Sequence, residues 1–153
     1  MIHVGTIFLG IALSFLSAAT KNIEKAFFQN EADLLFGQLS GRTRINLTLP
    51  EPISFSDQVS PEQTYFLFRK IFASYSTFEF YPESEFPLVL EKSHFIFKTR
   101  WSFKDNRTNN QFVLRVFFYM ADETPARGGP TLSLNLLPAS AWKIREIRAE
   151  VLW

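Results

Sequence analysis

The sequence predicts a domain of the α+β class, in which a curved antiparallel sheet packs on a long helix. The first observation is the order of segments, because helical patterns come early and long alternating strands follow them. The second is a pair of strictly alternating runs within residues 93–120. The third is composition, since 18 phenylalanines among 153 residues favour an aromatic core lining a sheet.

The composition is that of a single globular domain. With 46% hydrophobic and 20% charged residues, the chain can bury a sizeable core without disulfides or metal. The absence of cysteine removes thiol nucleophiles, cysteine-based zinc sites and disulfides. A net charge of +1 gives no long-range attraction to nucleic acid. Because the only histidines are His3 and His94, we expect no metal and no other cofactor.

Residues 1–19 have the pattern of a secretory signal peptide. The apolar run over residues 4–16 has the length of a signal core and is short for a membrane span. Small residues at 17–19 predict cleavage before a single mature domain, residues 20–153. No Lys or Arg precedes the run, so an uncleaved anchor or a buried first helix is the alternative. We expect a periplasmic or secreted protein without stable membrane insertion after cleavage.

The next segments alternate between helix and strand signals. Residues 22–39 have a helical pattern with Asn22 as a candidate N-cap, and residues 29–30 interrupt it, which predicts two short helices. Alternation over residues 43–49 predicts a strand, and residues 53–56 are a candidate second strand pairing back on it.

The strongest local signal is a capping box at the start of a helix. Ser60 is the predicted N-cap, Pro61 the first helical residue, and Gln63 the residue that bonds back to the cap. The helix is predicted to end near Tyr75. Its predicted buried stripe is Leu67, Phe68, Ile71, Phe72 and Tyr75.

Two further strands are predicted before the long hairpin. Residues 76–81 form the first, with Phe78 and Phe80 on one face and Glu79 and Tyr81 on the other. A loop over residues 82–87 follows, and then residues 88–90 form a short strand or a loop packed on the core.

Residues 93–120 predict a long antiparallel hairpin with one apolar face. Its polar loop, residues 105–110, consists of residues that favour turns. With this loop, Lys104 faces Gln111, and the same register places Arg100 opposite Arg115. The predicted core face is Phe95, Phe97, Thr99, Trp101, Phe103, Phe112, Leu114, Val116, Phe118 and Met120.

The end of the chain predicts one more long strand. Residues 121–130 read as a loop rich in Gly and Pro, and residues 131–137 as a strand or hydrophobic flap. Residues 142–153 form the last strand. Because Ile144 and Ile147 have opposite parity, we expect a β-bulge near Arg145 and Glu146.

These segments carry a resemblance to a known fold. The chain resembles an uncharacterised family of secreted bacterial proteins, largely from Bacteroidota, with the nuclear transport factor 2-like (cystatin-like) fold. The resemblance spans nearly the whole mature chain and implies fold and export. The superfamily includes ketosteroid isomerase-like enzymes, dehydratases and non-catalytic binding modules, and no motif here matches the isomerases' catalytic trio. The segments that carry it are residues 23–27, 55–72, 78–80 and 142–148.

Arg100 and Arg115 are the leading candidate site residues. Like charges directly opposed across a sheet repel, so an acidic neighbour such as Glu79, a bound anion or water should compensate them. One hypothesis is an anion-binding site formed by both arginines with Tyr119 as a hydroxyl donor. The alternative is a solvated outer face, or a homodimer surface on the sheet.

Other polar residues predict little chemistry. His94 has no orienting acid nearby in the sequence, and solvation on a helix surface explains Asp33 and Glu62 as well as a pocket role does. We therefore expect a non-enzymatic domain that binds a small apolar, amphipathic or anionic ligand, or a protein partner, through its sheet cavity or face. The alternative is a small enzyme with acid–base chemistry, which needs a perturbed carboxylate or histidine inside the cavity.

Overall fold

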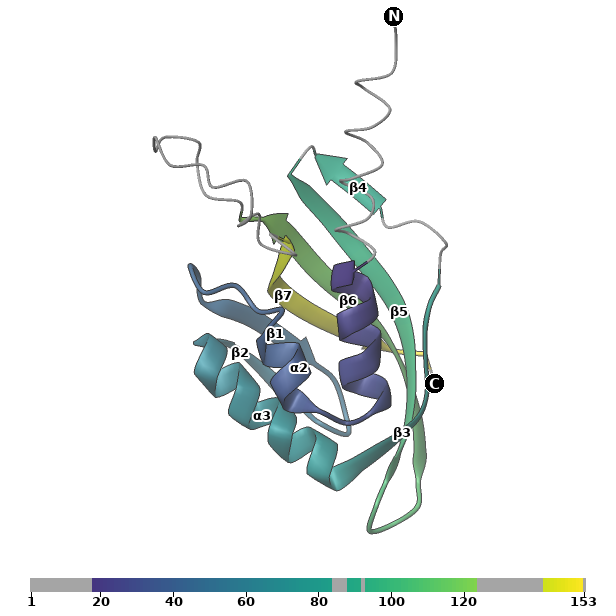
Figure 1. Cartoon of the computed structure of the whole chain (residues 1–153). Coiled ribbons are helices and arrows are strands. Elements are labelled where there is room, and N and C mark those ends of the chain that lie inside the picture. The colour runs from purple at the N-terminus through teal and green to yellow at the C-terminus, as the bar shows by residue number, and fades with distance from the viewer. Residues whose placement is uncertain (1–17, 84–87, 92, 124–141, 153) are drawn as a thin grey trace, which may run out of the picture.

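The computed structural model describes residues 18–83, 88–91, 93–123 and 142–152, with the backbone alone for 88–91. Figure 1 shows the helices gathered on one face of a curved sheet, which confirms the predicted α+β class. The predicted signal core and the predicted segment 131–137 lie outside the described residues. The elements are a helix over residues 18–28, α2 (Ala32–Phe36), β1 (Ile45–Leu49), β2 (Phe55–Val59), α3 (Pro61–Ser74), β3 (Tyr75–Pro82), β4 (Leu88–Glu91), β5 (His94–Asp105), β6 (Gln111–Asp122) and β7 (Trp142–Val151).

The strands form one sheet in the order β2-β1-β7-β6-β5-β3, and β4 pairs with β5 beside this path. Its neighbours pair antiparallel except for β1 and β7, which run parallel through Asn46 to Thr48. A parallel bridge between Leu39 and Ile144 lies outside the named strands. The chain therefore returns its last strand to the middle of the sheet, between strands that are far apart in sequence.

The helical segment before β1 is broken in two, as predicted. Asn30 has a positive φ of 54°, and Glu31 donates from its backbone to Ala26 rather than continuing the helix. The prediction that Asn22 is the N-cap is wrong, because residues 18–21 are already helical. The buried stripe of Ala19, Ile23, Ala26 and Phe27 continues through that position.

The predicted capping box of α3 is confirmed. The Ser60 hydroxyl oxygen accepts from the Gln63 backbone N–H at 3.1 Å, and the Gln63 side-chain oxygen accepts from the Ser60 backbone N–H at 2.9 Å. These bonds satisfy backbone donors that a helix start otherwise leaves without partners. From this start, α3 buries Phe68, Ile71 and Phe72.

The short strands correct two predictions. The second strand exists but spans Phe55–Val59, because a turn in which Ile53 and Ser54 donate to Pro50 takes up the preceding residues. The prediction that Phe78 shares a face with Phe80 is wrong. The pairing of β3 with β5 shifts between Thr77 and Glu79, which leaves Phe78 50% exposed while Phe80 is buried.

The long strands agree with the predicted pattern more closely. The core face of β5 and β6 is buried as expected except at Phe112, which is partly buried near the hairpin loop. β6 extends to Asp122, so the predicted loop begins later than residue 121. The predicted bulge in the last strand is confirmed. Tyr119 pairs with Glu146 and Met120 with Ile144, which makes Arg145 the extra residue.

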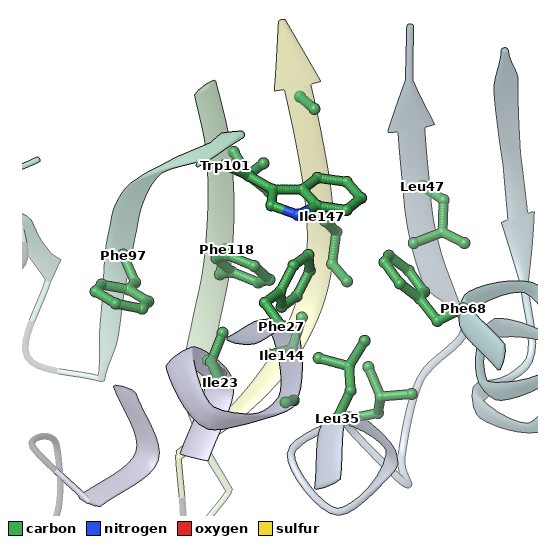
Figure 2. Packing of buried hydrophobic residues seen from close by; sticks show 14 of the residues in the cluster. Ile23, Phe27, Leu35, Leu47, Phe68, Phe97, Trp101, Phe118, Ile144 and Ile147 are labelled. Atoms are coloured by element: carbon green, nitrogen blue, oxygen red, sulfur yellow. The ribbon is translucent and has the colours of Figure 1, made fainter. Parts of the chain in front are cut away.

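Phe27 lies at the centre of the core. Its ring is 4.6 Å from that of Phe80 and 5.1 Å from that of Trp101, measured between centroids. The rings of Phe68, Phe72 and Phe118 lie within 5.8 Å of it. Figure 2 shows Phe27 projecting from its helix between Phe118, Trp101 and Phe68. The helix over residues 18–28 thus fills the concave side of the sheet with an aromatic side chain.

Candidate functional site

The candidate site lies on the outer face of the sheet, the face opposite the helices. We use outer face for the side chains on this side of β5, β6 and β7. The register prediction for this face is confirmed, because Lys104 pairs with Gln111 and Arg100 pairs with Arg115. The outer face includes Ile96, Lys98, Arg100, Ser102, Val113, Arg115, Phe117, Tyr119, Glu146, Arg148 and Glu150.

Arg115 is fully compensated by carboxylates. Its Nε donates to Glu83 Oε2 at 2.8 Å, and one terminal nitrogen donates to Glu150 Oε1 at 2.9 Å. The bonds to Glu150 and Glu83 raise the pKa of the Arg115 guanidinium. Lys98 Nζ also lies 3.5 Å from Glu83 Oε2. The acids that hold Arg115 are therefore Glu83 and Glu150.

Arg100 differs from the arginine that faces it. Among the residues that the structure describes, its guanidinium forms no ion pair, and its Nε is buried without a hydrogen-bond partner. Its other cross-strand neighbour is Tyr81 on β3, which is 39% exposed. A buried donor without a partner is costly, so the position of Arg100 lowers the stability of the isolated fold.

Tyr119 and Glu79 do not lie directly opposite either arginine. Tyr119 pairs with Ile96 and Glu146, four residues along β6 from Arg115, which is a span of about 13 Å at the rise of a strand. The Glu79 carboxylate accepts a hydrogen bond from the Ser102 hydroxyl at 3.4 Å. The geometry brings together Arg100, Arg115 and Tyr81 more closely than it does the four proposed residues.

The outer face also carries apolar side chains. Ile96, Val113, Phe117 and Tyr119 are partly exposed, and the rings of Phe117 and Tyr119 lie 6.5 Å apart. Beyond β5, Phe78 adds an exposed ring at the edge of the sheet. Single apolar side chains are ordinary on a protein surface, but the aromatic and arginine residues of this face are of types enriched at protein interfaces.

The concave side offers a different environment. The described side chains around Phe27 are aromatic and aliphatic. Two buried hydroxyls on this side donate to backbone carbonyls, Thr99 to Val116 at 3.0 Å and Thr64 to Ser60 at 2.9 Å. The polar groups in this part of the core are therefore used for structure.

A buried polar cluster that sequence reasoning missed lies at the end of β6. The Glu123 side chain is 6% exposed, and its Oε2 accepts from the Ser40 hydroxyl at 2.5 Å and from Arg145 Nε at 3.1 Å. Arg42 donates to the Glu123 backbone carbonyl at 2.8 Å. The available signal was the bulge at Arg145, because a bulge re-aims a side chain. The cluster joins the segment after α2 to β6 and β7.

The other candidate acids and the histidine lie on the surface. His94 is exposed, and its Nδ1 lies 3.1 Å from the Ser93 hydroxyl. Asp33 on α2 is exposed, and its hydrogen bond with Tyr65 raises the pKa of that phenol. Glu62 is exposed in the first turn of α3. None of the three points into the core around Phe27.

Two kinds of feature are absent from the described residues. No cluster of three or more His, Asp or Glu side chains there has an arrangement that could hold a metal ion. No helix in that part of the chain has the length and apolar character needed to span a membrane.

Comparison with known proteins identifies the fold. No protein-family model and no curated sequence matches the chain. Among solved structures, a ketosteroid isomerase-like protein from Erwinia carotovora atroseptica is similar with a TM-score of 0.65 and 10% identity, covering 92% of this chain and 96% of that one.

Two further structures have the same architecture. An NTF2-like protein of unknown function in nutrient uptake from Rhodospirillum rubrum has a TM-score of 0.58 at 8% identity, with 90% and 98% coverage of this chain and that one. A cystatin-like domain of unknown function from Nostoc punctiforme has a TM-score of 0.56 at 6% identity, with 89% and 74% coverage. The chain has the nuclear transport factor 2-like fold, and at these identities the likeness extends to the fold alone.

Proposed function

We propose that this chain is a non-enzymatic, exported binding domain that holds an acidic, partly apolar segment of a partner protein on its outer face. The observation that carries the proposal is the contrast between the two opposed arginines. Arg115 has two carboxylate partners, whereas Arg100 has none among the described residues and keeps a buried Nε without an acceptor. Because Arg100 is only partly buried, a carboxylate of the partner would pair with the terminal nitrogens of its guanidinium.

The apolar side chains supply the second half of the proposed interaction. Phe117 and Ile96 lie on the same face as Arg100, and Tyr81 lies beside it on β3. A partner segment that combines a carboxylate with aliphatic or aromatic residues would bury this surface while pairing Arg100. Such anchors, an arginine and aromatic rings, are the residues that dominate binding energy at interfaces.

The filled core favours binding over catalysis within this proposal. Acid–base chemistry in the cavity, the alternative function, requires a titratable group among its lining residues. The side chains packed around Phe27 are aromatic and aliphatic, and the buried hydroxyls of Thr64 and Thr99 on this side donate to backbone carbonyls. The ketosteroid isomerase-like name belongs to a protein that shares 10% identity with this chain, so it carries no catalytic residue over.

Export and membership of the secreted Bacteroidota-type family are parts of the same proposal. Family membership rests on the resemblance carried by residues 23–27, 55–72, 78–80 and 142–148. Export rests on the apolar run over residues 4–16 and on the small residues at 17–19. Intact mass measurement of the protein from a bacterial periplasm tests this directly. A mass that begins at Thr20 supports export with cleavage, and a full-length mass in the cytoplasm contradicts it.

Selection from a displayed peptide library tests the binding function. We expect the protein to enrich peptides in which Asp or Glu is flanked by aromatic or aliphatic residues. Arg100→Met should lower the affinity for the selected peptide by about tenfold or more, because it removes a charge-assisted hydrogen bond. The matched control is Lys104→Met, which removes one positive charge from an exposed position on the same strand.

The outcomes separate three possibilities. Enriched acidic peptides that bind Lys104→Met normally and Arg100→Met weakly support the proposal. Peptides without acidic residues, or equal binding to both variants, contradict it. If the protein forms a dimer that Arg100→Glu dissociates in light-scattering measurements, the partner is a second copy of this chain.

A further inference from the structure

A groove separate from the outer face lies between α3 and the tip of the β5–β6 hairpin. Its volume is about 300 Å³, at the lower end of the range for small-ligand sites. Its apolar lining comes from α3, from the residue that follows it and from the turn before β2, and its polar lining includes the hairpin tip. The lining residues are Ile53, Leu67, Lys70, Ile71, Ser74, Tyr75, Asp105 and Arg107.

The walls of this groove are fixed by hydrogen bonds. The Asn106 backbone N–H donates to the Ser74 carbonyl at 3.0 Å, and its side-chain amide donates to the Ala73 carbonyl at 3.2 Å. Ser76 donates to the Asn106 side-chain oxygen at 2.6 Å. The hairpin tip therefore caps the last carbonyls of α3, which holds Arg107 next to the helix end.

The floor is apolar and partly aromatic. Tyr75 is half-buried, and its ring packs edge-to-face on Phe103 with centroids 5.2 Å apart. Burial, with a smaller contribution from Asp105, raises the pKa of the Tyr75 phenol. Ile71 is buried beside it, and Leu67 and Ile53 are partly exposed. An apolar ring or short chain of a ligand would fit against these side chains.

The charged residues that line the groove have a net charge of +1. Lys70 and Arg107 are exposed and form no ion pair with any described residue. Asp105 is engaged within the turn, because its Oδ1 accepts from the backbone N–H of Arg107 at 2.8 Å and of Thr108 at 3.4 Å. The exposed Glu51 acts electrostatically on Tyr75 but does not line the groove. The lining therefore has two positive charges and one negative charge, and the negative charge, on Asp105, is already engaged in hydrogen bonds. The net charge of +1 complements a ligand with a single negative charge.

We infer that this groove binds a small amphipathic monocarboxylate. The apolar part of the ligand lies on Ile71 and Tyr75, and its carboxylate lies between Lys70 and Arg107. Arginine suits this role because its planar guanidinium matches a carboxylate in a two-bond geometry. The inference does not depend on the outer face, since the lining residues and the outer-face residues are different sets.

Titration of the protein with phenylacetate, followed through its backbone amide signals by NMR, tests the inference. We expect saturable shifts around Ser74 and Arg107 with a dissociation constant of about 1–10 mM, the range of a small fragment. Phenylacetamide, which has the same ring without the charge, should bind with an affinity lower by about fivefold or more. Phenethylammonium should produce no saturable shifts there.

Charge-removing variants complete the test. Lys70→Gln and Arg107→Gln should each lower the affinity for phenylacetate by about threefold or more. In the double variant, phenylacetate should no longer give saturable shifts. Arg69→Gln removes the same charge from the neighbouring residue of α3, which does not line the groove, and should leave the affinity unchanged. The inference is overturned if phenylacetate gives no saturable shifts at the groove, if phenylacetamide binds equally well, or if Arg69→Gln weakens binding as much as Lys70→Gln.

Discussion

The two faces of the β5–β6 hairpin have opposite relations to the rest of the chain. On the concave face, Phe97, Trp101, Leu114 and Phe118 are at most 4% exposed and pack against one another and the helices. On the outer face, the same strands present Arg100 and Arg115 in partly exposed positions. The side chains of the concave face are held by packing against one another, whereas strand register determines which side chains are neighbours on the outer face. Substitutions on the concave face should alter mainly stability, whereas substitution of Arg100 on the outer face should alter binding.

Phe27→Ala should produce the largest loss of stability. It removes a fully buried ring that contacts five other aromatic rings, and truncations of this kind cost about 3–5 kcal/mol. Chemical denaturation measures the change. Phe28→Ala, at the next position and 60% exposed, should change the unfolding free energy by no more than about 0.5 kcal/mol. Equal losses in the two variants would contradict the assigned orientation of this helix.

Glu123→Gln should have the second-largest effect. The substitution keeps an acceptor for Ser40 but removes the ion pair with Arg145, so we expect a loss of about 1–3 kcal/mol. Because the Glu123 carboxylate is buried, this ion pair should contribute to stability as the apolar core does. Chemical denaturation of Glu146→Gln, a partly exposed carboxylate one residue from Arg145, is the control and should show a smaller change.

The two opposed arginines should respond differently to replacement by methionine. Arg115→Met leaves the carboxylates of Glu83 and Glu150 without their arginine partner, so the melting temperature should fall, although less than in Phe27→Ala. Arg100→Met removes a like-charge contact and a buried donor without a partner, so stability should stay the same or rise by up to about 1 kcal/mol. Scanning calorimetry of both variants measures the difference. Equal destabilisation in the two variants would show that Arg100, like Arg115, makes interactions that stabilise the folded state.

Substitution of Glu24, a partly buried residue of the first helix, should have the smallest effect on stability. Burial raises the pKa of this carboxyl above its ordinary value of 4.5, while Lys21 lowers it. Its protonated form is therefore favoured in the folded state, and that contribution is present below pH 4.5 and lost as pH rises through the folded pKa. Compared with wild type, Glu24→Gln should be relatively more stable at pH 7 than at pH 3.5. Thermal melts at both values, with the exposed Glu31→Gln as control, measure this difference.

The local features of the fold could be predicted because each depends on residues close in sequence. The capping box of α3 needs only Ser60 to Gln63, and the hairpin register needs only alternation and a turn-forming loop. The same register predicted that Arg100 would face Arg115. The bulge at Arg145 followed from a change of parity within one strand.

The features that could not be predicted depend on long-range pairing. Nothing in β1 indicates that it runs parallel beside β7, about a hundred residues later, because side-chain alternation is the same in either direction. The bulge at Phe78 gave no signal in the sequence, because Phe78 and Phe80 keep the spacing of residues that share one face of a regular strand. The partners of Arg115 were missed for the same reason, since Glu150 depends on the β6–β7 pairing and Glu83 lies just past β3.

The most direct test of the account measures stability and binding on the same variant. Arg100→Met is assayed for its melting temperature and for its affinity for the acidic peptide selected by the wild-type protein. The account predicts an unchanged or higher melting temperature together with binding weakened by about tenfold or more. A lower melting temperature with unchanged affinity would contradict it, because Arg100 would then support the fold and not the partner.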